Sequence, residues 1–217
     1  MTTLVVAGHT VSDGAALLDL RAGLPGASGY DRSAQALRVA AAHGLGLRDR
    51  LPLALHGSWM VNSRATSPVF QRWLQPAAEP AWEVLDAALA GGWDPSSPSR
   101  ETAGQAAAWL CSAGTGVAAL SKALGLLYPQ GMLLMDDHAL AYLGVAPAPA
   151  PGEEQGTAGA DRFVPALDAF TAAVEDNFDA LVALARGHRA ATLDAAQVLD
   201  RVLWMDSYGR RFFVATP

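Results

Sequence analysis

The chain has 217 residues, of which 51% are hydrophobic and 17% charged, and its formal net charge is −6 at pH 7. The apolar share excludes an intrinsically disordered chain, because enough hydrophobic side chains are present to form a core. The acidic balance argues against a protein that coats nucleic acid through a broad basic surface. It still allows a protein that binds a few phosphates with backbone N–H groups.

We expect a cytoplasmic protein with no membrane partner. Residues 1–6 lack the charged stretch and long apolar run of a signal peptide, and no apolar run approaches the roughly 20 residues that a membrane helix needs. Cys111 is the single cysteine, so an internal disulfide and a thiolate metal cluster are excluded.

Helical spacing of apolar residues dominates the first half of the chain. The stretch up to Pro25 is short and mixed, and Leu51–Met60 is apolar without a clear period. Start signals and apolar spacing predict helices from Asp31 to Gly44 or Gly46, from Ser67-Pro68 and from Glu79-Pro80, with loops at 23–29 and 91–100.

The second half is more regular. The apolar stripe Val117, Leu120, Leu124 and Leu127 predicts a helix over 117–128. Further helices are predicted over 101–112, from Asp136 to Leu143, over 161–187 with a break near Asn177, and over 192–205, with a tight turn at 113–116 and a flexible loop at 146–160.

These patterns predict an all-α protein, because convincing strand alternation is absent and no repeat of 20–50 residues appears. We expect residues 1–217 to form a single globular helical unit. The alternative is two intimate helical subdomains with a cleft between them, in which residues 109–144 carry the site.

Lys122 is the only lysine among 15 basic residues, the other 14 being arginine. Arginine carries a surface charge as well as lysine does, but it cannot lose its proton to act as a nucleophile or to form a Schiff base. Lys122 is therefore a candidate for chemistry. The alternative is that one lysine survived by chance in a chain rich in alanine, glycine and arginine.

The residues around Lys122 form a pattern with physical meaning. Gly114 and Gly116 allow a sharp turn that brings backbone N–H groups close to a partner, and a helix that starts there favours an anion such as phosphate. Asp136 or Asp137 opens the next helix, where a carboxylate is held ionised by free N–H groups. The alternative is that these aspartates only cap the helix.

The segment resembles the helix-hairpin-helix DNA glycosylase superfamily, most closely its 8-oxoguanine branch. Residues 113–118, Ala-Gly-Thr-Gly-Val-Ala, match the hairpin, and Met135-Asp136-Asp137-His138 resembles the Asp-x-His motif that holds the catalytic aspartate of that family. The match covers about 35 residues of 217. One departure matters: the family's nucleophilic lysine corresponds to Ala118, and Lys122 lies one helical turn later on the same helix face.

The resemblance implies cleavage of an N-glycosidic bond in DNA, after a damaged or modified nucleotide has been extruded from the duplex. Lys122 would attack the sugar and form a Schiff base, which is AP-lyase activity, and Asp136 would stabilise the developing positive charge or take protons. Alternatively the enzyme is monofunctional, with Asp136 assisting a water molecule. Nothing in the sequence decides between base-excision repair and anti-phage defence.

The same resemblance assigns DNA contacts. Gly114, Thr115, Gly116, Asp137 and His138 would lie along the bound strand, and Phe212 or Phe213 would stack on the extruded base. The six tryptophans are interpreted mostly as core anchors, with Trp59, placed in a loop at 57–59, expected to face a pocket. The histidines show no metal-ligand spacing, so we expect neither metal nor cofactor.

The alternative function comes from a different class. A helical DNA-binding or protein-interaction module can keep the hairpin fold after losing catalysis, and the acidic balance together with the missing lysine at Ala118 favours it.

Overall fold

The computed structural model of the chain describes residues 2–24, 27–59, 68–112, 116–147, 159–187 and 193–209. Eleven α-helices lie in these ranges: α1 (Gly14–Ala22), α2 (Ala27–Ala42), α3 (Leu47–Trp59), α4 (Pro68–Trp73), α5 (Glu79–Leu89), α6 (Ser99–Cys111), α7 (Val117–Leu127), α8 (Asp137–Tyr142), α9 (Phe163–Asp176), α10 (Phe178–Gly187) and α11 (Ala195–Trp204). Two short strands, β1 (Leu4–Val6) and β2 (His9–Val11), pair antiparallel. The predicted mostly helical chain is confirmed.

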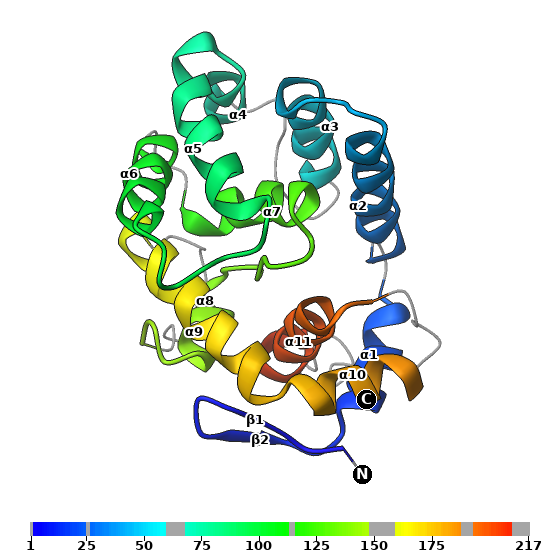
Figure 1. The fold of residues 1–217 in the computed structure, drawn as a ribbon. Coiled ribbons are helices and arrows are strands. Elements are labelled where there is room, and N and C mark those ends of the chain that lie inside the picture. Colours follow the sequence, from blue (N-terminus) through cyan, green and yellow to red (C-terminus); the bar gives the residue numbers. More distant parts are fainter. Residues whose placement is uncertain are drawn as a thin grey trace.

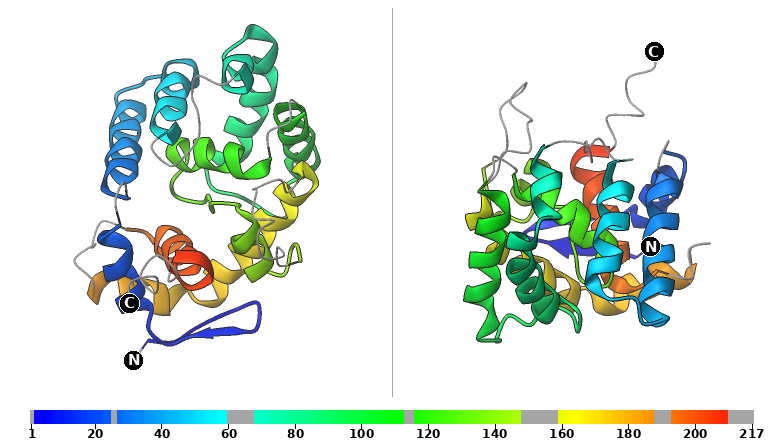
Figure 2. Two further views of the ribbon diagram at one scale, coloured as in Figure 1. Left: turned by 180° about the vertical axis from the view of Figure 1, so that it is seen from behind. Right: turned by 90° about the horizontal axis from the view of Figure 1, so that it is seen from above.

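The helices form two groups in space (Figure 1). Helices α2–α7 make up the upper part of the view, whereas β1, β2, α1 and α8–α11 make up the lower part, so the first and later elements of the chain lie together. Figure 2 shows the same grouping from behind. One cluster of buried side chains, from Leu17 of α1 through Leu124 of α7 to Val202 of α11, runs through both groups.

Helix α7 lies at the centre of this arrangement and contacts α2, α3 and α6. The four residues of its predicted apolar stripe are fully or almost fully buried. The predicted helix and its buried face are therefore confirmed. Because α7 carries Lys122, packing of this stripe fixes where the lysine emerges from the core.

The N-terminal region differs from the prediction. The structure has a β-hairpin and α1 where the sequence shows only a mixed stretch. Each strand has three residues, too few to display alternation, and the turn uses Ala7 and Gly8 with positive φ angles of 48° and 83°. The predicted loop at 23–29 is wrong in part, because α2 begins at Ala27.

Two further predictions are corrected. Leu51–Met60 falls largely within α3, which continues past Pro52 to Trp59, so Trp59 belongs to a helix and not to a loop. Among the tryptophans, Trp73, Trp82 and Trp93 are buried as expected, but Trp109 is 41% exposed. The predicted break of the long helix near Asn177 is confirmed, since α9 ends at Asp176 and α10 starts at Phe178.

Asn177 explains how the hairpin is attached to the helices. Its side-chain oxygen accepts from Val5 N at 2.8 Å, and its Nδ2 donates to the carbonyl oxygens of Val5 at 2.8 Å and of Ala173 at 2.9 Å. The amide thus pairs with both backbone groups of Val5 as a neighbouring strand would. No local sequence pattern predicts this contact, because the two residues are 172 positions apart.

We expect Asn177→Ala to lower the free energy of unfolding by about 1–3 kcal/mol, because backbone groups of Val5 and Ala173 lose their partner in a largely buried position. The measurement is urea unfolding followed by circular dichroism. Glu175→Ala, an exposed change at the end of α9 just before Asn177, is the control and should stay within about 0.5 kcal/mol of the wild type. Equal losses in both variants would contradict the role of the amide.

Candidate functional site

The site begins at the first residues of α7. Gly116 is the N-cap of this helix and has extended backbone angles. Glycine has no side chain that could accept a hydrogen bond from the first N–H groups of α7. Gly114 and Thr115 lie outside the described residues. Among the predicted phosphate-binding positions of the hairpin, Gly116 is therefore the one whose backbone is known.

Asp136 is the N-cap of α8, as the sequence predicts. Its Oδ1 accepts from Ala139 N at 2.8 Å, and its Oδ2 accepts from the indole Nε1 of Trp204 at 3.1 Å. Both oxygens are engaged, one by its own helix and one by the end of α11. Burial raises the pKa of this carboxyl group, and the two hydrogen bonds and the nearby His138 and Lys122 charges oppose that rise.

A serine docks the segment before α8 onto α7. Ser121 is almost fully buried; its Oγ accepts from Met135 N at 2.9 Å and donates to Ala118 O at 3.0 Å. Ser121 precedes Lys122, and Met135 precedes Asp136. This contact therefore brings the two candidate residues to the same place, although 14 positions separate them in the chain.

Lys122 is partly buried on α7. Burial lowers the pKa of its amine, and the negative charge of Asp136 partly opposes that shift. Each of the two groups alters the pKa of the other, so they lie within electrostatic reach in a poorly solvated setting.

Helix α2 contacts the backbone of α7 at Lys122. The Tyr30 hydroxyl donates to Lys122 O at 3.3 Å, and a Cβ atom placed on Gly125 would lie 2.7 Å from the Tyr30 oxygen. Glycine at 125 is thus needed for this close approach. Burial and the charges of Asp200 and Asp31 raise the pKa of Tyr30, so its hydroxyl stays protonated and acts as a donor.

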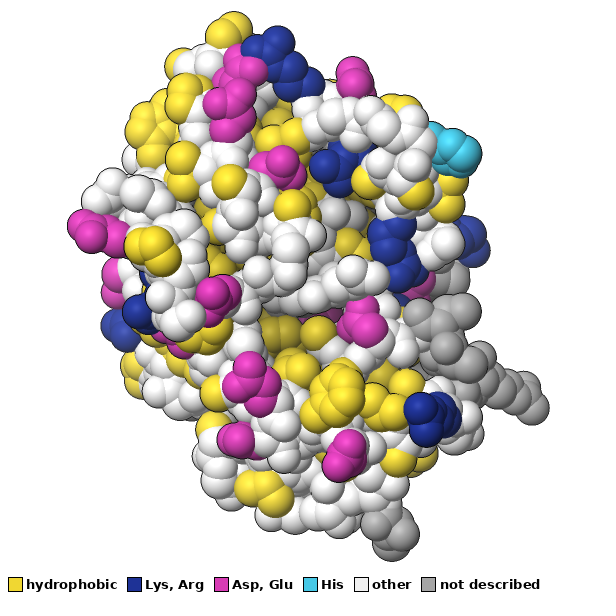
Figure 3. Space-filling model, in the orientation of Figure 1, with side chains coloured by type: hydrophobic (Ala, Val, Ile, Leu, Met, Phe, Trp, Pro, Cys, Tyr) yellow, Lys and Arg dark blue, Asp and Glu magenta, His cyan; other side chains and the backbone are white. Residues whose placement is uncertain are grey.

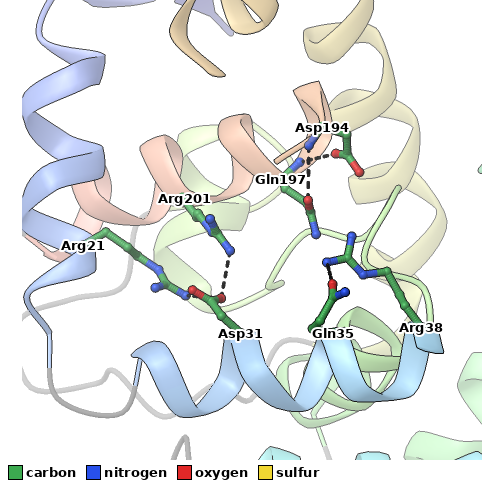
Figure 4. A network of polar contacts seen from close by, with 7 residues as sticks. All are labelled: Arg21, Asp31, Gln35, Arg38, Asp194, Gln197 and Arg201. Atoms are coloured by element: carbon green, nitrogen blue, oxygen red, sulfur yellow. Dashed lines mark hydrogen bonds and ion pairs between the residues drawn. The ribbon is translucent and has the colours of Figure 1, made fainter. Parts of the chain in front are cut away.

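An ionic network links the two groups of helices beside the site (Figure 4). Arg201 of α11 donates to Asp31 of α2 at 2.8 Å, and Arg21 of α1 lies 3.6 Å from the same carboxylate oxygen. Further along α11, Asp194 and Gln197 form a capping box. The consecutive helices α1 and α2 are joined here by charged groups to α11, about 170 positions later in the chain, which fixes the position of α11 relative to α2.

Asp200 connects this network to the segment that carries Asp136. Its Oδ1 accepts from Leu134 N at 2.8 Å. Burial raises the pKa of Asp200 to about 6, with Asp136 adding to the rise and Arg21 and Arg201 opposing it. Two carboxylates, Asp136 and Asp200, therefore share one weakly solvated region.

The raised pKa of Asp200 predicts a pH-dependent stability. The folded state holds the proton up to a pH of about 6, whereas the unfolded chain releases it near 3.9. Between these values the folded state binds more protons, so this group's stabilising contribution is lost as pH rises. We expect the free energy of unfolding of Asp200→Asn, measured relative to the wild type at the same pH, to increase by roughly 2 kcal/mol between pH 4 and pH 6.5.

Urea unfolding at a series of pH values measures this difference. Asparagine keeps a side-chain oxygen for Leu134 N and removes only the titration. Asp176→Asn, at an exposed position, is the matched control and should change the free energy of unfolding by less than about 0.5 kcal/mol. A wild-type to Asp200→Asn difference that stays constant with pH would contradict the prediction.

The other predicted site residues divide into two sets. Asp137 and His138 are partly buried in the first turn of α8, beside Asp136. Phe212 and Phe213 lie outside the described residues, as does the side chain of Trp59. Within the described ranges no group of three or more His, Cys, Asp or Glu side chains is arranged to hold a metal ion, and no helix there has both the length and the apolar character to cross a membrane.

The structure adds three residues that the sequence did not indicate: Tyr30, Asp200 and Trp204. Asp200 and Trp204 are one helical turn apart on α11, a spacing that places side chains on one face. The available signal is an acidic and an aromatic residue at this spacing, on a helix whose other large side chains are mostly apolar. It gains meaning only once α11 is known to pack beside α8.

Comparisons with models of protein families, with curated proteins and with solved structures found no match.

Proposed function

We propose that this chain is a DNA glycosylase that excises a damaged or modified base, a purine such as 8-oxoguanine being favoured, with Lys122 supplying an AP-lyase activity. The observation that carries the proposal is the coupled pair of Lys122 and Asp136, partly buried where Ser121 of α7 binds the segment before α8 and Trp204 of α11 binds Asp136. The hairpin resemblance gives this pair its substrate class, and base-excision repair and anti-phage defence are the two settings in which such an activity is used.

The chemistry requires an amine that is free of its proton. Burial lowers the pKa of Lys122, which increases the fraction of neutral amine at a given pH. The amine attacks C1′ of the extruded nucleotide, the N-glycosidic bond breaks, and the base leaves with the electron pair and takes up a proton. The attached nitrogen supplies the proton of the base. Asp136 takes the second proton of this nitrogen and passes it to the ring oxygen, as the bond from that oxygen to C1′ breaks and the C1′–nitrogen double bond of the Schiff base forms.

The position of the lysine is compatible with this role. Ala118, which corresponds to the usual lysine, is only 7% exposed, and its carbonyl group accepts from Ser121. Lys122 lies one turn further along α7, is partly exposed and is coupled to Asp136. Of the two positions, 122 is the one from which a long side chain can reach both the carboxylate and a substrate.

DNA binding under this proposal depends on local contacts. On the face in Figure 3, several basic side chains lie over α2 and α3, and acidic side chains are spread over both the upper and the lower half. The N-terminus of α7 at Gly116, together with Gly114, Thr115, Asp137 and His138, would bind the strand at the site, and Phe212, Phe213 and Trp59 would contact bases. These assignments come from the resemblance.

Borohydride trapping tests the proposal. The protein is incubated with duplex oligonucleotides carrying 8-oxoguanine or other modified bases, reduced, and analysed by mass spectrometry of the adduct. Because the chain has one lysine, an adduct forms on Lys122 or on the N-terminal amine, and peptide mapping separates the two. Lys122→Arg keeps the positive charge without the ability to form a Schiff base, so it should lose the adduct while retaining DNA binding.

Three outcomes are distinguished. An adduct on Lys122 that is lost in Lys122→Arg supports the bifunctional enzyme. Base release without an adduct supports a monofunctional glycosylase, in which Asp136 assists water. DNA binding with no base release from the whole substrate panel supports the second candidate, a non-catalytic helical DNA-binding or protein-interaction module, which the buried Ala118 in place of lysine favours.

A further inference from the structure

Helix α8 is held at both ends by the end of α11. At its first turn, Trp204 donates to the carboxylate of Asp136. At its last residue, the Tyr142 hydroxyl donates to Asp206 at 2.7 Å, and Asp206 lies in the π-helical turn Met205–Gly209 that follows α11. A helix of six residues has little stability of its own, so these contacts set where α8 lies.

The two contacts differ in what they hold. The bond from Tyr142 fixes the backbone of α8 through a side chain at its far end. The bond from Trp204 acts directly on Oδ2 of Asp136, the oxygen that α8 does not use. With Oδ1 bound to Ala139 N and Oδ2 bound to the indole, the plane of the carboxylate is fixed and both bonds favour its ionised form.

Asp200 supports the same segment one turn earlier on α11. It accepts from Leu134 N, while Ser121 accepts from Met135 N. Three consecutive residues, 134 to 136, thus each make a hydrogen bond to another side chain. These side chains are Asp200 of α11, Ser121 of α7 and Trp204 of α11. The charged groups that act on Asp136 are Lys122 from α7, His138 from α8 and Asp200 from α11.

We infer that Trp204 is a positioning residue, whose indole N–H orients the Asp136 carboxylate toward the Lys122 amine and keeps it ionised. The assignment rests on the proposed function for its catalytic meaning. The physical coupling of Trp204, Asp136 and Lys122 is testable without DNA. Trp204 acts through Asp136, and Asp200 acts on the same carboxylate through the backbone of residue 134.

The single lysine provides a selective probe for this coupling. Reductive methylation with ¹³C-formaldehyde labels Lys122 and the N-terminal amine alone, and Lys122→Arg identifies the lysine resonance by its absence. In NMR titrations this resonance should show its own ionisation at alkaline pH and a smaller step at acidic pH caused by Asp136. Asp136→Asn should remove the smaller step.

The decisive variant is Trp204→Phe, which keeps an aromatic ring and removes the N–H. Loss of a hydrogen bond to the charged form should raise the midpoint of the acidic step by about one pH unit. Tyr142→Phe removes the other contact that holds α8, and Trp82→Phe removes a buried indole bond to Trp73 O away from the site. Neither should move the step.

Activity provides the second readout. In Trp204→Phe the acidic limb of the pH profile for base release should shift by the same amount, with kcat lowered about tenfold and KM unchanged. If the wild type releases no base, the proposed function fails while the titration still decides the coupling. A step that is absent in the wild type, unmoved in Trp204→Phe or moved equally in Tyr142→Phe would overturn the inference.

Discussion

We expect the Asp136→Asn variant to release base about 10²–10⁴ times more slowly than the wild type under single-turnover conditions. A neutral amide can neither stabilise a developing oxocarbenium ion nor accept a proton from the Lys122 amine. Removal of the negative charge should also lower the pKa of Lys122 further, because Asp136 at present opposes the effect of burial.

Asparagine at 136 should keep α8 in place, since it is as good an N-cap as aspartate and its side-chain oxygen can still accept from Ala139 N. Its amide nitrogen cannot accept from the Trp204 indole, so the variant also loses that bond. Asp194→Asn is the matched control. Asp194 caps α11 through Gln197 N at 2.8 Å, the same distance that Asp136 makes to Ala139 N, and burial raises its pKa as well. A similar loss of rate in both variants would show that the effect comes from capping and not from the site.

The largest expected effect on stability follows from replacing Leu124 by alanine. Leu124 is 0% exposed and lies at the centre of the apolar stripe of α7. Its removal should cost about 2–5 kcal/mol, through lost burial and the cavity left behind. For a chain of this size each kcal/mol corresponds to a fall in Tm of about 2–4 °C.

Leu53→Ala is the matched control, because Leu53 is the same residue type on α3 but is 52% exposed. It should change stability by less than about 0.5 kcal/mol. Calorimetry and urea unfolding measure both variants. A loss below about 1 kcal/mol in Leu124→Ala would contradict the central packing of α7, and with it the argument that the core fixes where Lys122 emerges.

Features that depend on neighbouring residues could be predicted from the sequence. The stripe on α7 follows from helical periodicity, and the role of Asp136 as N-cap of α8 follows from local hydrogen bonding between a short carboxylate and the next turn. Both required only that a helix form. The break at Asn177 belongs to the same class.

Features that depend on contacts between distant residues could not be predicted from the sequence. The hairpin is held by Asn177 from 172 positions away, and its three-residue strands carry no periodic signal. The sequence predicts only a core anchor at Trp204, because nothing local indicates that its indole contacts Asp136. The same applies to Asp200, whose importance comes from its burial beside residue 134.

Trp109 shows a different source of error. The buried residues of α6 are Ala103, Ala106, Ala107 and Leu110, a regular stripe that leaves Trp109 on the other side. The prediction that Trp109 is a core anchor rests on the size and apolar character of its side chain, and it is wrong because this stripe faces the core. For this helix, periodicity predicts burial better than residue type.

The contact between Asn177 and Val5 also has a consequence for association between molecules. A strand at the edge of a sheet offers unpaired backbone groups to strands of other chains, which is a common route to aggregation. In this protein the N–H and carbonyl groups of Val5 are already occupied by one side-chain amide, although the Val5 side chain itself is 55% exposed. The amide of Asn177 thus prevents another strand from pairing with β1 at Val5, where the exposed apolar side chain would favour association.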